Sequence, residues 1–340
     1  IGGGSISPQN IYGGFLWPYQ MNRTLFGMEG LNWGGKVNDT VFYYRGKLTP
    51  VHLRPGKIFD DGKPDDYKKE RYRIYKLRRG WETLPFGIER DKYEKDYNEW
   101  AVEDGAPWID IDGDGIFTRG IDQPDYIGDE ILWFVANDLD TNILSPYRDP
   151  IGLEFHTFLY GFNRTGILGD VVFRKTRIIN KSNYTITDMY IGLNSFITLG
   201  NENDNYVGCD TSLNMAFGYN VTNNDAIYGT PPPALGHLLL QGPTVKAGIN
   251  DSAYYNNSWI KGAKNLPMTS FLFYYKTTPN DSNKYTSLFL NVDKNFRNNL
   301  YNNLSGLLWS GYEIINPNTL NKTKYMVSGD PVTGIGWYEG

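Results

Sequence analysis

Three aspartates at alternate positions are the residues of this sequence whose types and spacing most clearly indicate chemistry. Asp110, Asp112 and Asp114 are followed by Gly115. Carboxylates at alternate positions, ahead of a glycine where the backbone turns sharply, form the first half of a calcium-binding loop. Carboxylates this close repel one another unless a cation is present. The segment therefore predicts a Ca²⁺ site, with a solvated acidic turn as the alternative.

Position within the loop predicts the remaining ligands. Ile116 would offer its backbone carbonyl oxygen at the seventh position, and Thr118 would ligate at the ninth position directly or through water. A helix-loop-helix calcium hand has a bidentate Glu at the twelfth position, but here Ile121 stands there and Asp122 follows. We therefore expect a calcium loop outside a paired hand, closed by Asp122.

Two later carboxylates, Asp125 and Asp129, are weaker alternatives for closing the loop. In either case the ion would be structural and would fix a long irregular loop. The sequence holds a single cysteine, Cys209, so no intrachain disulfide can do this. Calcium at extracellular millimolar concentration would fill even a weak site of this kind.

A second acidic patch surrounds Cys209 and contains Glu202, Asp204 and Asp210. Its spacing fits no ligand template, so a polar loop is the favoured interpretation and a second cation site the alternative. Cys209 has no cationic neighbour in sequence that would lower its thiol pKa, and we expect it to be packed.

Motifs of nucleophilic, phosphate-binding and dinucleotide-binding chemistry do not occur in the sequence. The three histidines, His52, His156 and His237, are far apart and match no metal-ligand spacing. The sequence therefore predicts a non-catalytic protein. The alternative is a carbohydrate-binding module or a glycoside-active enzyme, because glycosidases need only two carboxylates that no sequence pattern reveals. The abundant Tyr and Trp would then stack on sugars, whereas otherwise they fill a β core.

Glycosylation acceptors of the pattern Asn-x-Ser/Thr occur about threefold more often than random placement would give. A glycosylated extracellular surface is one interpretation, and the shared preference of Asn and Thr for polar turns is the other. Asn303 also matches but lies in a segment with a helical pattern. The candidate acceptors are Asn22, Asn38, Asn163, Asn180, Asn183, Asn220, Asn250, Asn256, Asn280 and Asn321.

Composition predicts the fold class that must position these residues. The chain contains 26 Tyr, 17 Phe and 9 Trp together with 38 Gly and 18 Pro. This mixture is typical of strands joined by many turns. We expect a mainly β chain: an antiparallel β-sandwich with two short helices and long calcium-braced loops. The 33 basic and 38 acidic side chains give a net charge of −5 without a basic tract, which argues against a nucleic-acid partner. No apolar run is long enough for a membrane span.

Hydrophobic periodicity places the individual elements. Helices are expected at 89–100 and 294–309, and strands within 40–53, at 72–77 and at 271–276. The segments 171–179 and 184–197 predict two strands of one β-hairpin, joined by the turn Asn180 to Asn183. For domains, we expect an N-terminal arm and β-rich segment at 1–100 and a calcium-loop β-sandwich at 101–340, or one continuous domain.

Several sequence blocks between Gly80 and Gly340 resemble a group of large secreted bacterial surface proteins, many of which carry a C-terminal sorting domain for type IX secretion. The blocks are Gly105-Ala-Pro-Trp108, Trp133-Phe-Val-Ala-Asn-Asp-Leu139, Asn163-Arg-Thr-Gly166, Ile178-Ile-Asn-Lys-Ser182, Gly208-Cys-Asp210, Asn265-Leu-Pro-Met-Thr-Ser270 and Ser328-Gly-Asp-Pro-Val-Thr-Gly334 ahead of Gly336-Trp337. The resemblance implies export and an extracellular or cell-surface location, but no activity. The sorting domain is not in this sequence, so we expect a processed piece or the ordered part of a larger protein.

Together these features predict a calcium-stabilised, glycosylated structural protein outside the cell. Self-assembly into a filament or layer is an extension of this hypothesis. In it, the Gly-rich arm from Ile1 to Tyr19 adds a strand to the next subunit and covers its sheet edge.

Overall fold

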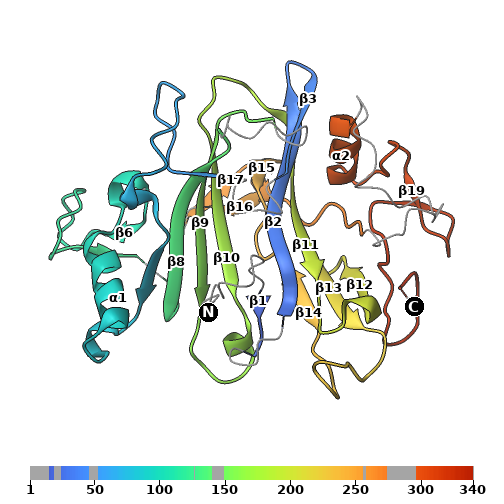
Figure 1. Cartoon of the computed structure of the whole chain (residues 1–340). Helices are drawn as coiled ribbons and strands as arrows, with labels where there is room; N and C mark the ends of the chain where they lie inside the picture. The colour runs from blue at the N-terminus through green and yellow to red at the C-terminus, as the bar shows by residue number, and fades with distance from the viewer. Residues whose placement is uncertain are drawn as a thin grey trace. The chain divides into compact units, whose positions relative to one another are not determined.

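A computed structural model describes most of the chain and shows a mainly β protein with antiparallel sheets and two α-helices (Figure 1). The predicted fold class is therefore confirmed. None of the helices among the described residues is both long enough and apolar enough to cross a bilayer. The described residues are 15–18, 24–45, 53–125, 127–139, 149–255, 258–273 and 296–339.

The chain divides into two compact units that interleave along the sequence. Unit 1 contains the described residues between 53 and 185, and unit 2 contains those before 46 and after 185. Unit 1 is thus inserted between two parts of unit 2. The domain boundary near residue 100 that we expected from the sequence stays a prediction.

Unit 1 is built on a five-stranded antiparallel sheet in the order β10-β9-β8-β4, with β5 also paired to β8. Along β8, Ile131, Trp133 and Val135 alternate with more exposed residues and face the core. The strands are β4 (Arg54–Pro55), β5 (Tyr75–Arg78), β8 (Glu130–Asn137), β9 (Leu153–Gly161) and β10 (Phe173–Asn180).

Helix α1 (Ile88–Asn98) and the segment after it pack against this core, close to the predicted range of 89–100. Trp100 is 1% exposed, and its ring centroid lies 5.7 Å from Trp133 and 5.8 Å from Tyr75. Aromatic pairs at such separations contribute about 1 kcal/mol each beyond the area they bury. The core thus holds the chain in place just before the acidic loop begins.

Unit 2 contains a second antiparallel sheet, in which the long strand β2 (Thr24–Val37) pairs with β1 (Phe15–Leu16), β3 (Thr40–Arg45) and β11 (Thr187–Ile197). Helix α2 (Phe296–Leu304) lies within the predicted range of 294–309 and packs on this sheet. The glycines Gly34 and Gly192 allow its close approach, because a Cβ at either position would lie within 3.2 Å of Leu304.

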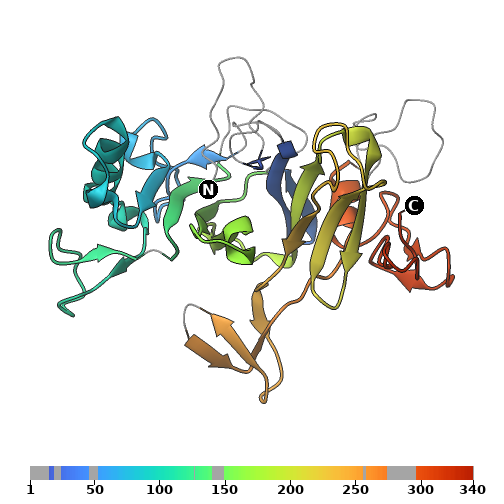
Figure 2. The ribbon, with the colours of Figure 1, turned by 90° about the horizontal axis from the view of Figure 1, so that it is seen from below.

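Smaller antiparallel ladders complete both units. Figure 2 shows the hairpin of β16 and β17 projecting from its neighbours in unit 2. The short strands are β6 (Trp108–Ile109), β7 (Gln123–Pro124), β12 (Asn205–Asp210), β13 (Met215–Asn220), β14 (Leu235–Leu238), β15 (Thr244–Lys246), β16 (Ser252–Tyr255), β17 (Ser258–Lys261), β18 (Ala263–Asn265), β19 (Ile314–Ile315) and β20 (Lys322–Thr323). The 3₁₀ helices are Glu70–Tyr72, Trp81–Thr83, Val102–Asp104, Ile167–Asp170 and Glu202–Asp204.

The predicted hairpin of 171–179 and 184–197 is wrong in its pairing, although both strands exist. Strand β10 pairs along its whole length with β9, whereas β11 pairs with β2. Alternating hydrophobicity identifies a strand but does not specify its partner. The turn itself forms, because the Asn180 side chain accepts hydrogen bonds from Ser182 and donates one to the carbonyl of Tyr184.

Other expected elements are found in part. The strand expected at 72–77 is β5, and a 3₁₀ turn occupies its predicted start. Of the segment expected at 271–276, Phe271 forms a bridge with Tyr325, and 274–276 lie outside the described residues. Most of the N-terminal arm also lies outside them, apart from β1 and the two residues after it.

Candidate metal centre

The acidic loop leaves and rejoins unit 1 through the two-residue ladder of β6 and β7, where Trp108 pairs with Pro124. The ring of Trp108 packs edge-on against Phe117, with centroids 5.5 Å apart. The ladder fixes both ends of the loop, and the ring contact holds its middle. The chain between the two strands runs in bends and turns that carry the carboxylates.

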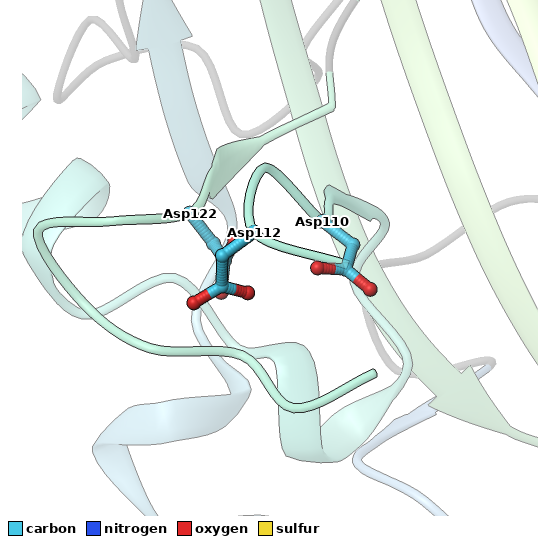
Figure 3. Close-up of side chains that lie close together, drawn as sticks. All are labelled: Asp110, Asp112 and Asp122. Carbon is cyan, nitrogen blue, oxygen red and sulfur yellow. The ribbon is translucent and has the colours of Figure 1, made fainter. Parts of the chain in front are cut away.

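Asp110, Asp112 and Asp122 converge within this loop (Figure 3). Each offers one carboxylate oxygen, and these oxygens all lie within 4.8 Å of one another. Asp110 and Asp112 are exposed, whereas Asp122 is only 4% exposed. Three oxygen donors at this separation can ligate one divalent cation and leave its other positions to water or backbone carbonyls.

Asp122 anchors the loop from its buried end. Its Oδ1 accepts a hydrogen bond of 2.8 Å from the Ile111 amide, and its Oδ2 accepts one of 2.6 Å from the Thr118 amide. Hydrogen bonds from amides leave further lone pairs on each carboxylate oxygen. Asp122 can therefore organise the loop and still face a cation.

Asp110 arranges the exposed side of the loop. Its two carboxylate oxygens accept hydrogen bonds from the amides of Gly113 and Gly115, at 2.7 and 2.9 Å. Both glycines have φ near +78°, a backbone conformation that costs glycine little. The sharp turn predicted at Gly115 is thus present.

Asp112 is the carboxylate of the loop on which the charges of the others act. Desolvation of this carboxyl group and the charges of Asp114, Asp122 and Asp110 raise its pKa, against a hydrogen bond from the Asp114 amide that lowers it. A cation beside these groups would relieve the repulsion and favour the charged form.

The predicted ligand set is only partly brought together. Asp114 does not belong to the converging group, and its Oδ1 accepts a 2.7 Å hydrogen bond from the Ile116 amide. Ile116 and Thr118 lie in the same loop, and their roles as ligands stay predictions. Of the alternative closing residues, Asp129 accepts a hydrogen bond from the Asn163 amide, and the Asp125 amide donates to the Pro107 carbonyl.

The second acidic patch is spread over β12. Asp204 precedes this strand and Asp210 ends it, so the length of the strand separates them. Asp210 instead caps its own turn by accepting hydrogen bonds from Ser212 and Leu213. Cys209 is buried, as expected, and burial together with the charge of Asp210 raises its pKa to about 12.

Sequence reasoning missed a buried polar network in unit 1. On β9, Glu154 and His156 are both 4% exposed, and His156 Nε2 lies 2.8 Å from Glu154 Oε1. Glu154 also accepts a hydrogen bond from the Ile58 amide. Burial alone would raise the pKa of Glu154, but these hydrogen bonds hold it below its usual value. The available signal was two polar residues at i and i+2 in an otherwise apolar strand.

Asp104 is buried in the segment before the acidic loop and carries two ion pairs. Arg71 donates to it at 2.6 Å, and Lys57 lies 3.2 Å from its other oxygen. The next residue, Gly105, has φ of +93° and packs against the ring of His156, where an added Cβ would lie 2.4 Å from Cε1. These groups stabilise the segment that leads into the acidic loop.

The aromatic side chains are divided between core and surface. Trp33, Trp100 and Trp133 are fully buried. By contrast, Trp259 on β17 is 72% exposed and lies against Tyr254 of β16, with ring centroids 5.4 Å apart and planes at 62°. The two rings are not coplanar.

Comparison of the chain with protein-family models, curated proteins and solved structures finds no match. The resemblance to secreted surface proteins therefore stays an expectation from sequence.

Proposed function

We propose that this chain is a non-catalytic extracellular structural or surface protein, stabilised by Ca²⁺ at Asp110, Asp112 and Asp122 and glycosylated on its surface. The observation that carries the proposal is the convergence of these three carboxylates in one loop. Their spacing in sequence and their proximity in space support the same ion.

The donor set favours calcium over other common metals. All three side chains supply hard oxygen donors, which suit Ca²⁺ and Mg²⁺ rather than Zn²⁺. Mg²⁺ demands a near-ideal octahedron, whereas Ca²⁺ accepts irregular geometry. An exposed, turn-rich loop places its oxygen ligands irregularly, which suits Ca²⁺.

A structural role fits the place of the loop. Its ends are joined by a ladder of two residue pairs, and three of its carboxylates, Asp110, Asp112 and Asp114, are exposed. An ion that binds the folded loop and not the unfolded chain stabilises the fold by mass action. Calcium at ten times its Kd would add about 1.4 kcal/mol to the free energy of unfolding.

Titration calorimetry with Ca²⁺ and thermal unfolding with and without a chelator test the site. We expect one bound ion and a lower melting temperature after chelation. Asp112→Asn should abolish this response, while the stability without ion changes by less than about 0.5 kcal/mol, because the side chain is exposed and accepts only one long hydrogen bond.

Two matched variants sharpen this test. Asp114→Asn should keep most of the calcium response if the ligands are the three converging carboxylates, and lose it if the ligand set is the one expected from spacing. Asp60→Asn removes a fully exposed carboxylate elsewhere in unit 1 and should leave the response intact. An unchanged melting temperature of the wild-type protein on chelation would refute the calcium site.

Self-assembly is tested on native material by negative-stain electron microscopy and light scattering. Filaments or large oligomers that dissociate on chelation support a calcium-braced polymer. A deletion of Ile1 to Tyr19 should abolish assembly if that arm donates a strand, and normal assembly without it would exclude strand donation.

A second candidate function is glycan binding, favoured by the exposed ring of Trp259. A flat exposed indole can stack on a sugar ring, and Tyr254 holds it from one side. A glycan array that detects binding by the wild-type protein and loses it with Trp259→Ala would favour this candidate. Absence of binding to any glycan would reject it.

A further inference from the structure

We infer that the native fold separates the Asn-x-Ser/Thr sites into those that can carry a glycan and those that cannot. The inference rests on the glycosylated extracellular function proposed above and names the modified residues. The first class is Asn38, Asn163, Asn183, Asn250 and Asn321, and the second is Asn220 and Asn303.

Covalent geometry sets the criterion. An N-linked glycan replaces one hydrogen on the side-chain nitrogen Nδ2 with a bulky, hydrated sugar. That nitrogen must therefore reach solvent in the folded protein. A close-packed interior has no space for a sugar beside a buried atom.

The five asparagines of the first class are exposed. None of the hydrogen bonds within the described part of the chain uses their side-chain amides. Asn38 is the clearest case, because it lies in the two-residue turn between β2 and β3 with φ of 48°. Its hydroxyl partner in the acceptor pattern, Thr40, is exposed as well.

Asn220 fails the criterion although its sequence pattern is complete. It ends β13 opposite Asn205, whose amide donates a 3.1 Å hydrogen bond to Asn220 Oδ1. This contact turns Nδ2 of Asn220 inward, where it has no access to solvent. Asn303 lies in α2, and its Nδ2 is inaccessible in the same way.

Asn180 belongs to neither class. It is exposed, but its Nδ2 donates a 2.9 Å hydrogen bond to the Tyr184 carbonyl. A glycosylated nitrogen keeps one hydrogen, so this bond and a sugar can coexist there. Asn22, Asn256 and Asn280 lie outside the described residues.

The order of modification and folding does not change the outcome. If the sugar is added to folded protein, the transferase that attaches it cannot reach Nδ2 of Asn220. If it is added earlier, a chain modified at Asn220 cannot bury Nδ2 or form the packing around that atom. Folded molecules therefore lack a glycan at Asn220 in both cases.

Site-resolved glycopeptide mass spectrometry on the folded, secreted protein tests the inference. We expect glycans at members of the first class and unmodified peptides at Asn220 and Asn303. A glycan at Asn220 or Asn303 in folded protein would overturn the inference while leaving the glycosylated function standing. Unmodified peptides at every acceptor would overturn the glycosylated part of the proposed function itself.

A matched pair of variants tests the same assignment from the mass of the intact protein. Thr40→Ala removes the Asn38 acceptor pattern and keeps the asparagine in its turn, so the protein should lose the mass of one glycan. Thr222→Ala removes the Asn220 pattern and should leave the mass of attached glycan unchanged. A mass loss with Thr222→Ala, or none with Thr40→Ala, would contradict the assignment.

Discussion

At the scale of single residues, the positions of the acidic loop differ in how far the sequence predicts them. The turn at Gly115 and the convergence of Asp110 with Asp112 follow from local spacing, because residues two apart lie close in any tight turn. Asp122 could be anticipated as a closing residue from the calcium-loop template, because it follows the twelfth loop position. The exclusion of Asp114 could not be anticipated, because it depends on where the folded turn directs each carboxylate, which the spacing in sequence does not specify.

Gly105 provides a prediction at this scale. Gly105→Ala should destabilise the protein by about 3 kcal/mol or more, because it combines a left-handed backbone with a Cβ placed 2.4 Å from the His156 ring. Gly120→Ala is the matched control, since its φ of +87° is similar and a Cβ would meet nothing within 4 Å. It should cost about 1 kcal/mol. Urea unfolding measures both, and equal costs would show that His156 does not restrict this position.

At the scale of elements, periodicity identified both helices and the strands β3, β5, β10 and β11, but not the partners of these strands. Tyr93, Tyr97 and Trp100 recur with helical spacing; the first two lie in α1, and Trp100 follows its end and enters the core. The local sequence does not specify that β11 pairs with β2, because the partner residues, such as Ile191 and Trp33, are far apart in the chain. Partner choice depends on contacts that form only when the whole unit assembles, which explains the failed hairpin.

The seating of α2 on its sheet gives the prediction at this scale. Gly192→Ala should destabilise unit 2, because its new methyl group would lie 2.8 Å from Leu304 Cδ2 and force that side chain to move. In a Leu304→Ala background the same change should cost about 1 kcal/mol less. Urea unfolding of the four proteins of this cycle measures the coupling. An identical cost in both backgrounds would mean that Leu304 does not limit the approach of the helix.

At the scale of the whole molecule, acid stability reflects ionised carboxylates that the fold holds in place. Burial alone would raise the pKa of Asp65, but hydrogen bonds from Lys69, Tyr72 and the Asp66 amide lower it to about 2. Between pH 4 and 2 the unfolded chain therefore binds more protons at this residue than the folded one. Its stabilisation is complete above about pH 4 and is lost as the pH falls toward 2.

Urea unfolding between pH 2 and 7 checks this dependence. Asp65→Asn should lower the free energy of unfolding by up to about 2 kcal/mol at pH 7, and the difference from wild type should shrink as the pH approaches 2. Asp60→Asn, which changes a fully exposed carboxylate, should follow the wild-type curve. A difference that stays constant with pH would show that the ionised form of Asp65 is not what stabilises the fold.

The insertion of unit 1 between the two parts of unit 2 also determines the order in which a growing chain can fold. Strand β2 leaves the ribosome before unit 1, but its partner β11 follows only after unit 1 has been made. The five strands of the sheet in unit 1 have all been synthesised before β11, so unit 1 can fold first. Until then β2 lacks its pairing with β11, and an unpaired strand edge invites association with other chains. The nascent chain thus has a period of vulnerability that begins at β2 and ends only when β11 emerges.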